Sequence, residues 1–252
     1  MKKIAFYNIK GGVGKTSSSI TVAHMLAQKG FKTLIIDLDA QSNATDFFEC
    51  YDEDGLTVAD VLTGTQAEKV IRPTKYDNLY ILPSSLTLGR VEKALISDVS
   101  IPQQFRLKTA LKSIEDKFDY CIIDCSPAAE SLINVNGLTV ADEVYVPLKC
   151  DKWAVRGLNS TIEVINTISN YNTSLHFAGC FFCQWENRNV NKQVFEYLKK
   201  ELGDKLLNNR IRKNKSVEEI TYEQIALSEY DKKGKATEDY KNLTEIILKA
   251  SK

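Results

Sequence analysis

The chain of 252 residues has little of several features that mark specialised classes of protein. It has six cysteines and two histidines, and its 33 Lys and Arg balance its 33 Asp and Glu. Six cysteines are too few for a disulfide scaffold of this size, so we expect reduced thiols and a cytoplasmic protein. A net charge of zero excludes a globally basic, histone-like binder, but it leaves room for a local basic patch.

Long hydrophobic runs, repeats and linkers are missing as well. No window approaches 18 uninterrupted apolar residues, and the first apolar stretch stops at Asn8, which is too early for a signal sequence. No stretch rich in Pro, Gly or Ser divides the chain. We therefore expect residues 1–252 to form one domain, which is long enough to bury a core of its own.

The chain does contain a regular alternation of short apolar runs and amphipathic segments. The apolar runs predict strands at 4–9, 33–37, 120–124, 143–148 and 175–182. Helical spacing predicts helices at 15–28, 107–118, 158–168 and 240–250, and the least regular parts are 43–103 and 203–235. Continuous apolar strands between amphipathic helices are typical of a parallel sheet covered on both faces. We therefore predict an α/β fold with a single doubly wound domain and a mostly parallel central sheet.

A glycine-rich loop lies between the first predicted strand and the first predicted helix. It reads Lys10-Gly11-Gly12-Val13-Gly14-Lys15-Thr16-Ser17, which follows the P-loop pattern except that Ile9 stands where a glycine is usual. Glycines let backbone N–H groups turn toward one anion, and the positive end of the following helix points to the same place. Lys15 would neutralise phosphate charge, and the Thr16 hydroxyl would bind Mg²⁺. A second lysine, Lys10, could fold back on its own nucleotide or cross to another subunit.

Carboxylates follow two of the predicted strands. Asp37 and Asp39 come at the end of the strand at 33–37, and Asp124 ends the strand at 120–124. The carboxyl ends of parallel strands line the ligand crevice of an open α/β sheet. The first pair could hold Mg²⁺-bound waters or polarise an attacking water, and Asp124 could hold Mg²⁺ directly or through water.

The loop with its early lysine resembles the deviant Walker A motif of the ParA/MinD family of P-loop ATPases. The resemblance extends over nearly the whole chain, through Asp37–Asn43, Asp124–Pro127, Val140–Pro147, Gly157-Leu158, Asn187-Arg188, Ile211–Val217, Tyr230-Asp231 and Glu238–Tyr240. The sequence departs from the family pattern at Ser17, Ala40 and Ser126. None of these departures removes a chemical group that the mechanism needs.

The resemblance implies a Mg²⁺-dependent ATPase with ATP as its nucleotide. It implies that Thr16, Asp37 and Asp124 serve the metal and that Asp39 orients or activates the hydrolytic water. Lys15 would act on the phosphates of its own subunit, and Lys10 would reach across a homodimer to the partner's phosphates. The residues expected to contact the nucleotide are Lys10, Gly11, Gly12, Val13, Gly14, Lys15, Thr16, Ser17, Asn187, Arg188, Ile211, Arg212 and Asn214.

A P-loop that starts at residue 10 leaves no room for an N-terminal helix-turn-helix, so the chain is most similar to the short, Soj-like partition proteins. The segment 205–215 has no acidic residue and carries five cations, namely Lys205, Arg210, Arg212, Lys213 and Lys215. Such a cluster suits contact with DNA phosphates irrespective of sequence. The resemblance therefore implies a partition ATPase whose ATP-bound dimer associates with the nucleoid and is released by a ParB-like partner.

Three alternatives share the P-loop. A MinD-like ATPase that cycles on a membrane needs a C-terminal amphipathic helix with bulky apolar residues, whereas residues 247–252 contain two lysines and no aromatic residue, so we expect no membrane binding. An iron–sulfur relative would use Cys180 and Cys183, but positions i and i+3 of a strand face opposite sides. A biosynthetic enzyme of the same fold stays open, because only a substrate pocket would distinguish it. His24 and His176 lie in apolar periodic segments, so we expect no histidine-based catalysis.

Overall fold

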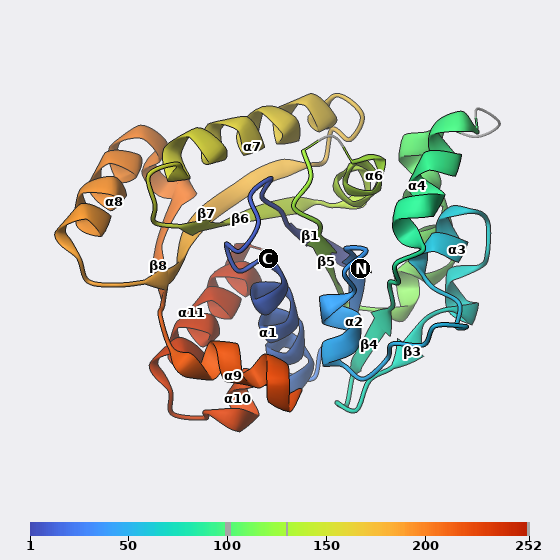
Figure 1. Ribbon diagram of the computed structural model, residues 1–252, viewed down its shortest axis with the longest axis horizontal. Helices are drawn as coiled ribbons and strands as arrows, with labels where there is room; N and C mark the ends of the chain where they lie inside the picture. The colour runs from blue at the N-terminus through green and yellow to red at the C-terminus, as the bar shows by residue number, and fades with distance from the viewer. Residues whose placement is uncertain (99–101, 130, 251–252) are drawn as a thin grey trace.

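The computed structural model describes residues 1–98, 102–129 and 131–250. Within these residues eight strands form one sheet in the order β3-β4-β2-β5-β1-β6-β7-β8 (Figure 1). The strands are β1 (Lys2–Phe6), β2 (Thr33–Leu38), β3 (Arg72–Pro73), β4 (Leu79–Leu82), β5 (Tyr120–Cys125), β6 (Glu143–Lys149), β7 (His176–Trp185) and β8 (Leu206–Arg212). Neighbouring strands are parallel except for β3 and β4 at one edge. The predicted α/β fold with a mostly parallel sheet is confirmed.

Helices cover both faces of this sheet (Figure 1). One face carries α3 (Val58–Leu62), α4 (Leu88–Ser97), α5 (Arg106–Leu111), α6 (Leu132–Val140), α7 (Ala154–Ser169) and α8 (Asn189–Leu202). The other carries α1 (Lys15–Gln28), α2 (Asn43–Phe47), α9 (Lys215–Glu223), α10 (Leu227–Tyr230) and α11 (Lys235–Ala250). Short 3-10 turns occur at Ala67–Lys69, Gln103–Phe105, Lys112–Lys117 and Gly203–Lys205.

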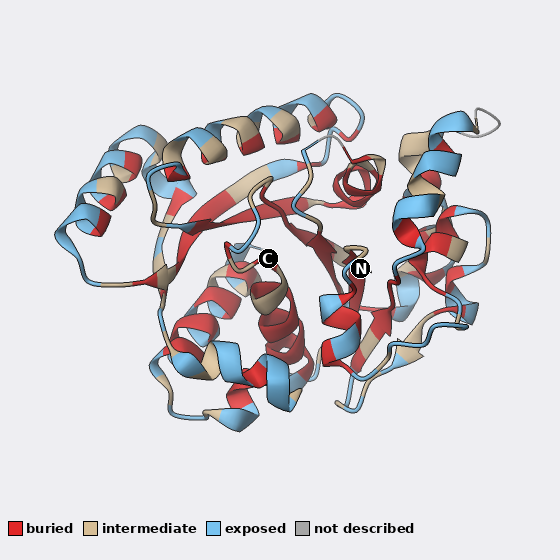
Figure 2. Cartoon of the chain, viewed as in Figure 1, coloured by how far each residue is buried: buried red, intermediate tan, exposed pale blue. Residues whose placement is uncertain are grey.

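The hydrophobic core consists of two layers, one on each side of the sheet. Successive residues of a strand alternate between them: Ile4 and Phe6 of β1 belong to the layer under α1, whereas Ala5 and Tyr7 belong to the opposite layer. Figure 2 shows the central strands buried along their length. Burial on both faces is the reason why these strands read as continuous apolar runs.

Helix α1 follows the P-loop and runs through the middle of its layer. Gly14 precedes it with a left-handed φ of 95°, and the helix ends near Gly30, whose φ is 90° and whose N–H bonds to the Ala27 carbonyl. The predicted bounds of 15–28 are confirmed. Helix α11 packs on α1, where the Ser18 and Tyr240 hydroxyls lie 3.2 Å apart.

Most of the elements that the sequence did not predict lie in its two irregular regions, and α6 and α8 are two further helices outside them that it did not predict. The polar residues Asn208 and Asn209 interrupt the apolar pattern of the edge strand β8, and its pairing with β7 shifts register. The predicted helix at 107–118 is split, because α5 ends at Leu111 and a 3-10 turn follows it.

The structure also shows where the two cysteines of the possible iron–sulfur motif lie. Cys180 and Cys183 lie in β7 and belong to different core layers, as the strand spacing predicts. Among the described residues there is no group of three or more His, Cys, Asp or Glu side chains arranged to hold a metal ion. In the same parts of the chain, every helix is too short or too polar to cross a membrane.

Candidate nucleotide-binding site

The P-loop occupies the turn between β1 and α1, at the carboxyl end of the central strands. Gly12 and Gly14 have left-handed backbone conformations, with φ of 70° and 95°. A side chain at Gly14 would also crowd the Cys183 sulfur, which lies 3.1 Å from where a Cβ would stand. The left-handed conformation therefore favours glycine at Gly14, and the nearby sulfur adds to that preference.

Lys15, the first residue of α1, is buried and points back over the loop. Its Nζ donates a hydrogen bond to the Lys10 carbonyl at 2.9 Å. Burial lowers the pKa of Lys15, and the nearby Asp124 carboxyl opposes that shift. An anion in the loop would therefore meet a cation that is already stripped of most of its water, so that their attraction is weakly screened.

Asp37 and Asp124 are the second-to-last residues of the neighbouring strands β2 and β5, where they stand directly opposite each other in register. Asp124 Oδ1 accepts a hydrogen bond from Ser19 Oγ at 2.9 Å, and the nearby Thr16 hydroxyl acts to lower the pKa of this carboxyl group. Asp124 Oδ2 is buried and has no partner among the described residues. Burial, and then the charge of Asp37, raises the pKa of Asp124. An unpartnered buried oxygen next to a hydroxyl fits a divalent cation, so Thr16 and Asp124 suit the predicted magnesium site.

Asp37 differs from Asp124 because the chain already supplies donors to both of its oxygens. Oδ1 accepts the Asp39 N–H at 3.0 Å, and Oδ2 accepts the N–H and hydroxyl of Thr45 at 2.9 and 2.8 Å. Burial raises the pKa of Asp37, and these donors oppose the shift. Asp37 thus fixes the turn that carries Asp39, and its role as a magnesium ligand stays a prediction.

Asp39 stands at the mouth of the loop, half-buried, with Oδ1 accepting the Gln41 N–H at 2.9 Å. It faces a cavity of about 350 Å³ that adjoins the P-loop. The residues that line this phosphate cavity are Gly11, Gly12, Gly14, Lys15, Thr16, Ser17, Asp39, Gln41, Asn43, Pro127 and Gln184. A lysine, a hydroxyl and a carboxylate thus converge on one space of the size that a triphosphate needs.

A second cavity, of about 390 Å³, continues from the first on the side of β8 and α9. Its lining residues are Gly14, Ser17, Cys183, Gln184, Ile211, Arg212, Lys213, Asn214, Val217, Glu218, Thr221, Tyr222 and Tyr240. We call it the base cavity, because it contains Ile211, Arg212 and Asn214, which the sequence analysis expects to contact the nucleotide. Two other residues expected there, Asn187 and Arg188, line neither cavity, and Arg188 pairs with Glu186 at 2.9 Å.

Gln184 lines both cavities and was not predicted from the sequence. It lies in β7 with a left-handed φ of 52°, and its Nε2 donates to the Gly12 carbonyl at 3.3 Å. One signal for it existed, namely a lone amide side chain at the end of an otherwise apolar strand. That signal is weak, because polar residues are common where strands end.

Lys10 is held on its own subunit. Its Nζ forms an ion pair with Asp151 Oδ2, in the loop between β6 and α7. The ion pair lowers the pKa of Asp151 against the effect of its partial burial. In this structure Lys10 therefore lies beside the phosphate cavity and is not among the residues that line it.

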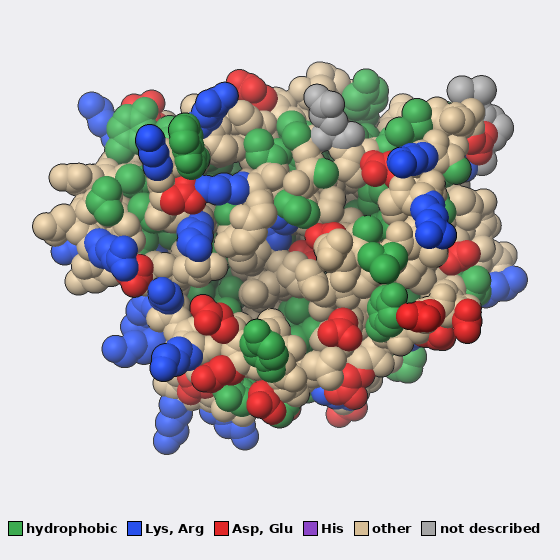
Figure 3. Space-filling view, viewed as in Figure 1, with side chains coloured by type: hydrophobic (Ala, Val, Ile, Leu, Met, Phe, Trp, Pro, Cys, Tyr) green, Lys and Arg blue, Asp and Glu red, His purple; other side chains and the backbone are tan. Residues whose placement is uncertain are grey.

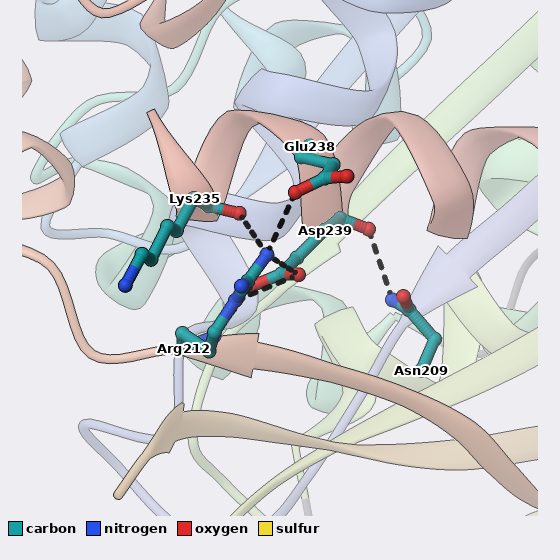
Figure 4. Close-up of polar contacts among 5 residues, drawn as sticks. All are labelled: Asn209, Arg212, Lys235, Glu238 and Asp239. Atoms are coloured by element: carbon teal, nitrogen blue, oxygen red, sulfur yellow. Dashed lines mark hydrogen bonds and ion pairs between the residues drawn. The ribbon is translucent and has the colours of Figure 1, made fainter. Parts of the chain in front are cut away.

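Arg212, one of the predicted DNA contacts, already has partners within the chain. Its guanidinium bonds to both carboxylate oxygens of Asp239, to Glu238 at 3.0 Å and to the Lys235 carbonyl (Figure 4). These contacts raise the pKa of Arg212, above all the hydrogen bonds to Asp239. Because its donors are used to anchor β8 to α11, Arg212 serves the fold.

The other four predicted DNA contacts are used to different degrees. Arg210 stacks over the rings of Phe195 and Trp185, at 3.9 and 4.9 Å from their centroids. Lys205 donates to a backbone carbonyl of β7, Lys213 lies 3.8 Å from Glu186, and Lys215 is exposed at the start of α9. Figure 3 shows Lys and Arg side chains gathered over the side of the molecule that carries α8, β8 and α10, with acidic side chains between them over α9.

Known proteins share both the sequence and the fold. A family model described as an AAA domain matches residues 1–177. The chain is 34% identical to the chromosome-partitioning ATPase Soj of Treponema pallidum, over 98% of this chain and 97% of the relative. It superimposes on a plasmid partition protein from Borrelia burgdorferi with a TM-score of 0.79 and 27% identity, over 99% and 98% of the two chains.

The same fold also occurs in a biosynthetic enzyme. The cobyrinic acid a,c-diamide synthase of Mycobacterium smegmatis, solved with an ATP analogue and magnesium, has a TM-score of 0.83 and 25% identity, over 98% of this chain and 94% of the other. The fold alone therefore does not separate partition from biosynthesis. With its early lysine in the P-loop, the chain belongs to the ParA/MinD-type family of P-loop ATPases.

Proposed function

We propose that this protein is a partition ATPase that hydrolyses ATP in the presence of Mg²⁺ and binds DNA as an ATP-bound dimer. The observation that carries the proposal is the convergence of Lys15, Thr16 and Asp39 on one cavity, with the buried carboxylate of Asp124 close behind it. The similarity to Soj and to a plasmid partition protein supports partition over other uses of this site.

The residues of the cavity divide the chemistry of hydrolysis between them. Backbone N–H groups of the P-loop and Lys15 bind the phosphates. Thr16 and Asp124 hold magnesium, which when bound offsets phosphate charge. Asp39 orients the attacking water, and Asp37 keeps Asp39 in place through the N–H bond at 3.0 Å.

Lys10 acts in the dimer, where it offsets the charge of the partner's phosphates. Two triphosphates that face each other across an interface repel strongly, and a lysine from each subunit offsets that repulsion. To reach the partner's phosphates, Lys10 must break its ion pair with Asp151. In the single chain this ion pair keeps Lys10 on its own subunit. The exchange is favourable when a triphosphate offers more negative charge than one carboxylate.

DNA binding falls to the lysines that the fold leaves exposed. Lys213 and Lys215 flank the N-cap residue Asn214 and lie close to the base cavity. Contacts of this kind neutralise phosphates and read no sequence. A dimer doubles the number of contacts, so ATP switches DNA binding on, and a ParB-like partner that stimulates hydrolysis switches it off. The protein would then associate with the nucleoid.

The test is to measure binding of random duplex DNA with AMPPNP, with ADP and without nucleotide, at one ionic strength. The expected result is tight binding with AMPPNP only, and no binding by the Lys15→Ala variant under any condition. Sedimentation with anionic liposomes under the same three conditions tests the MinD-like alternative. Nucleotide-independent DNA binding, or liposome binding in place of DNA binding, would contradict the proposal.

A further inference from the structure

A concave surface lies next to the P-loop on the side away from the base cavity. It encloses about 470 Å³ and is lined by Ile9, Lys10, Trp153, Arg156, Gly157 and Ser160. Trp153 is the N-cap residue of α7 and is 55% exposed, whereas the second tryptophan, Trp185, is 8% exposed. An indole that is half in water at the edge of a concavity is the kind of side chain that anchors protein interfaces.

Hydrogen bonds connect this surface to the phosphate cavity. Lys15 Nζ donates to the Lys10 carbonyl at 2.9 Å, and Lys10 Nζ pairs with Asp151 Oδ2. The other oxygen of Asp151 accepts the Trp153 N–H at 2.9 Å. A change at Lys15 or Lys10 therefore reaches the backbone of Trp153 through one carboxylate.

The surface is also positively charged. Lys149, Lys152 and Arg156 are exposed, and Asp151 is the one acidic residue in the segment 149–157. Lys152 Nζ lies 5.1 Å from the centre of the Trp153 ring. Two copies of such a surface repel each other unless anions lie between them. A bound triphosphate next to Lys10 supplies those anions, which gives a physical reason why association would require ATP.

We propose that Trp153 is the aromatic anchor of the contact between two ATP-bound copies of this chain. The proposal rests on the ATP-dependent dimer of the proposed function and names a contact within it. A second copy of this chain is the partner that fits this surface. If the phosphates of a second copy reach Lys10, that copy must also cover the concave surface that Lys10 lines. The indole would be buried against the partner, with the cations around it facing the partner's phosphates.

The position of Trp153 allows a direct spectroscopic test. In the Trp185→Phe variant, Trp153 is the single tryptophan, and its emission and its quenching by acrylamide report its exposure. We expect a blue shift and protection from acrylamide when AMPPNP and Mg²⁺ are added, at those protein concentrations where sedimentation velocity shows a dimer. If Trp185→Phe folds poorly, the difference between the spectra of the wild-type protein and Trp153→Phe gives the same quantity.

A second measurement compares two exposed aromatic residues at opposite ends of α7. Trp153→Ala should raise the dimer dissociation constant with AMPPNP about tenfold or more, while nucleotide affinity at low protein concentration is unchanged. Tyr171→Ala, which removes an aromatic side chain that is 53% exposed, should leave both constants unchanged.

The outcomes separate this inference from the function on which it rests. If the wild-type protein dimerises with AMPPNP while Trp153 stays open to acrylamide and Trp153→Ala dimerises normally, the inference is wrong and the proposed function stands. If the wild-type protein does not dimerise with AMPPNP at any accessible concentration, the dimer of the proposed function fails and the inference fails with it.

Discussion

The phosphate cavity and the base cavity lie side by side, yet they are built in different ways. The phosphate cavity is formed mostly by two short segments, 11–17 and 39–43. The base cavity combines the end of β7, the end of β8, α9 and Tyr240 of α11. The wall around the phosphates therefore consists mostly of residues that are contiguous in the sequence. The wall of the base cavity forms only when segments that are distant in the sequence pack together.

Chemistry explains this difference. A phosphate group requires several N–H donors and a cation within a few ångströms, and a glycine-rich turn before a helix supplies them from consecutive residues. A purine base requires a wall of suitable shape, which many combinations of side chains can supply. Tyr222 lines the base cavity and is 87% exposed, so a substitution there can alter the shape of this wall without disturbing the core.

The largest effect on ATP binding and turnover should come from Lys15, the cation of the phosphate cavity. Lys15→Ala removes a buried positive charge and the donor to the Lys10 carbonyl. We expect ATP affinity and turnover to fall by about a hundredfold or more, measured by calorimetry and phosphate release. Lys29→Ala, at the exposed end beyond α1, is the control and should behave as wild type. Normal turnover by Lys15→Ala would refute the assignment of the phosphate cavity.

Asp39→Asn should separate binding from hydrolysis. The amide oxygen of Asn can still accept the Gln41 N–H, so the turn is preserved while the charge is lost. We expect ATP affinity close to wild type and a single-turnover rate about a hundredfold lower, because water activation alone is lost. An unchanged rate would move the catalytic carboxylate elsewhere, and Asp37 would be the next residue to examine.

The sequence was most informative where local rules decide the structure. The strand–loop–helix around the P-loop, the bounds of α1 and the carboxylates at the ends of β2 and β5 all follow from the periodicity and composition of short segments. The structure brings Lys15, Thr16 and Asp39 to one cavity and places Asp37 and Asp124 side by side on neighbouring strands, as the predicted parallel sheet requires.

The sequence was least informative where a side chain has a choice of partners. Arg212 looks like its basic neighbours in the sequence, and only the packing of α11 on β8 reveals that Asp239 and Glu238 bind it. Asp151 lies far from Lys10 in the sequence, so their ion pair had no local signal. Composition identifies a basic segment, and tertiary contacts decide which of its cations are available.

Variants of Lys10 test whether the phosphate site needs a residue from a second subunit. Lys10→Ala should bind ATP with nearly wild-type affinity but dimerise about tenfold or more weakly with AMPPNP, because the interfacial phosphates lose a counter-charge. Asp151→Asn is the matched variant, since it weakens the hold on Lys10 without removing the lysine. It should dimerise at least as well as wild type. Light scattering over a concentration series measures both, and equal dimerisation by Lys10→Ala would refute a role across the interface.

The lysines beside the base cavity should show a smaller, salt-dependent effect. For the double variant Lys213→Ala/Lys215→Ala we expect weaker binding to unrelated DNA sequences alike. The slope of log affinity against log salt should flatten by about 0.9 for each lysine that contacts a phosphate. Fluorescence anisotropy at several salt concentrations measures this slope. Lys112→Ala, on the opposite face, is the control, and an unchanged slope in the double variant would place the DNA elsewhere.

Gln184 is the residue through which the two cavities can be compared most directly, because it lines both and its amide donates to the Gly12 carbonyl. Gln184→Met keeps a side chain of similar length and removes the donor. The loss of one neutral hydrogen bond is worth about 1 kcal/mol, or roughly fivefold in affinity. Calorimetry with ATP and with inorganic triphosphate separates the two walls, since triphosphate fills the phosphate cavity alone. We expect both ligands to weaken by the same factor, because the damage is to the P-loop. If ATP alone weakens, Gln184 acts on the base, and the two cavities are more independent than their shared residue implies.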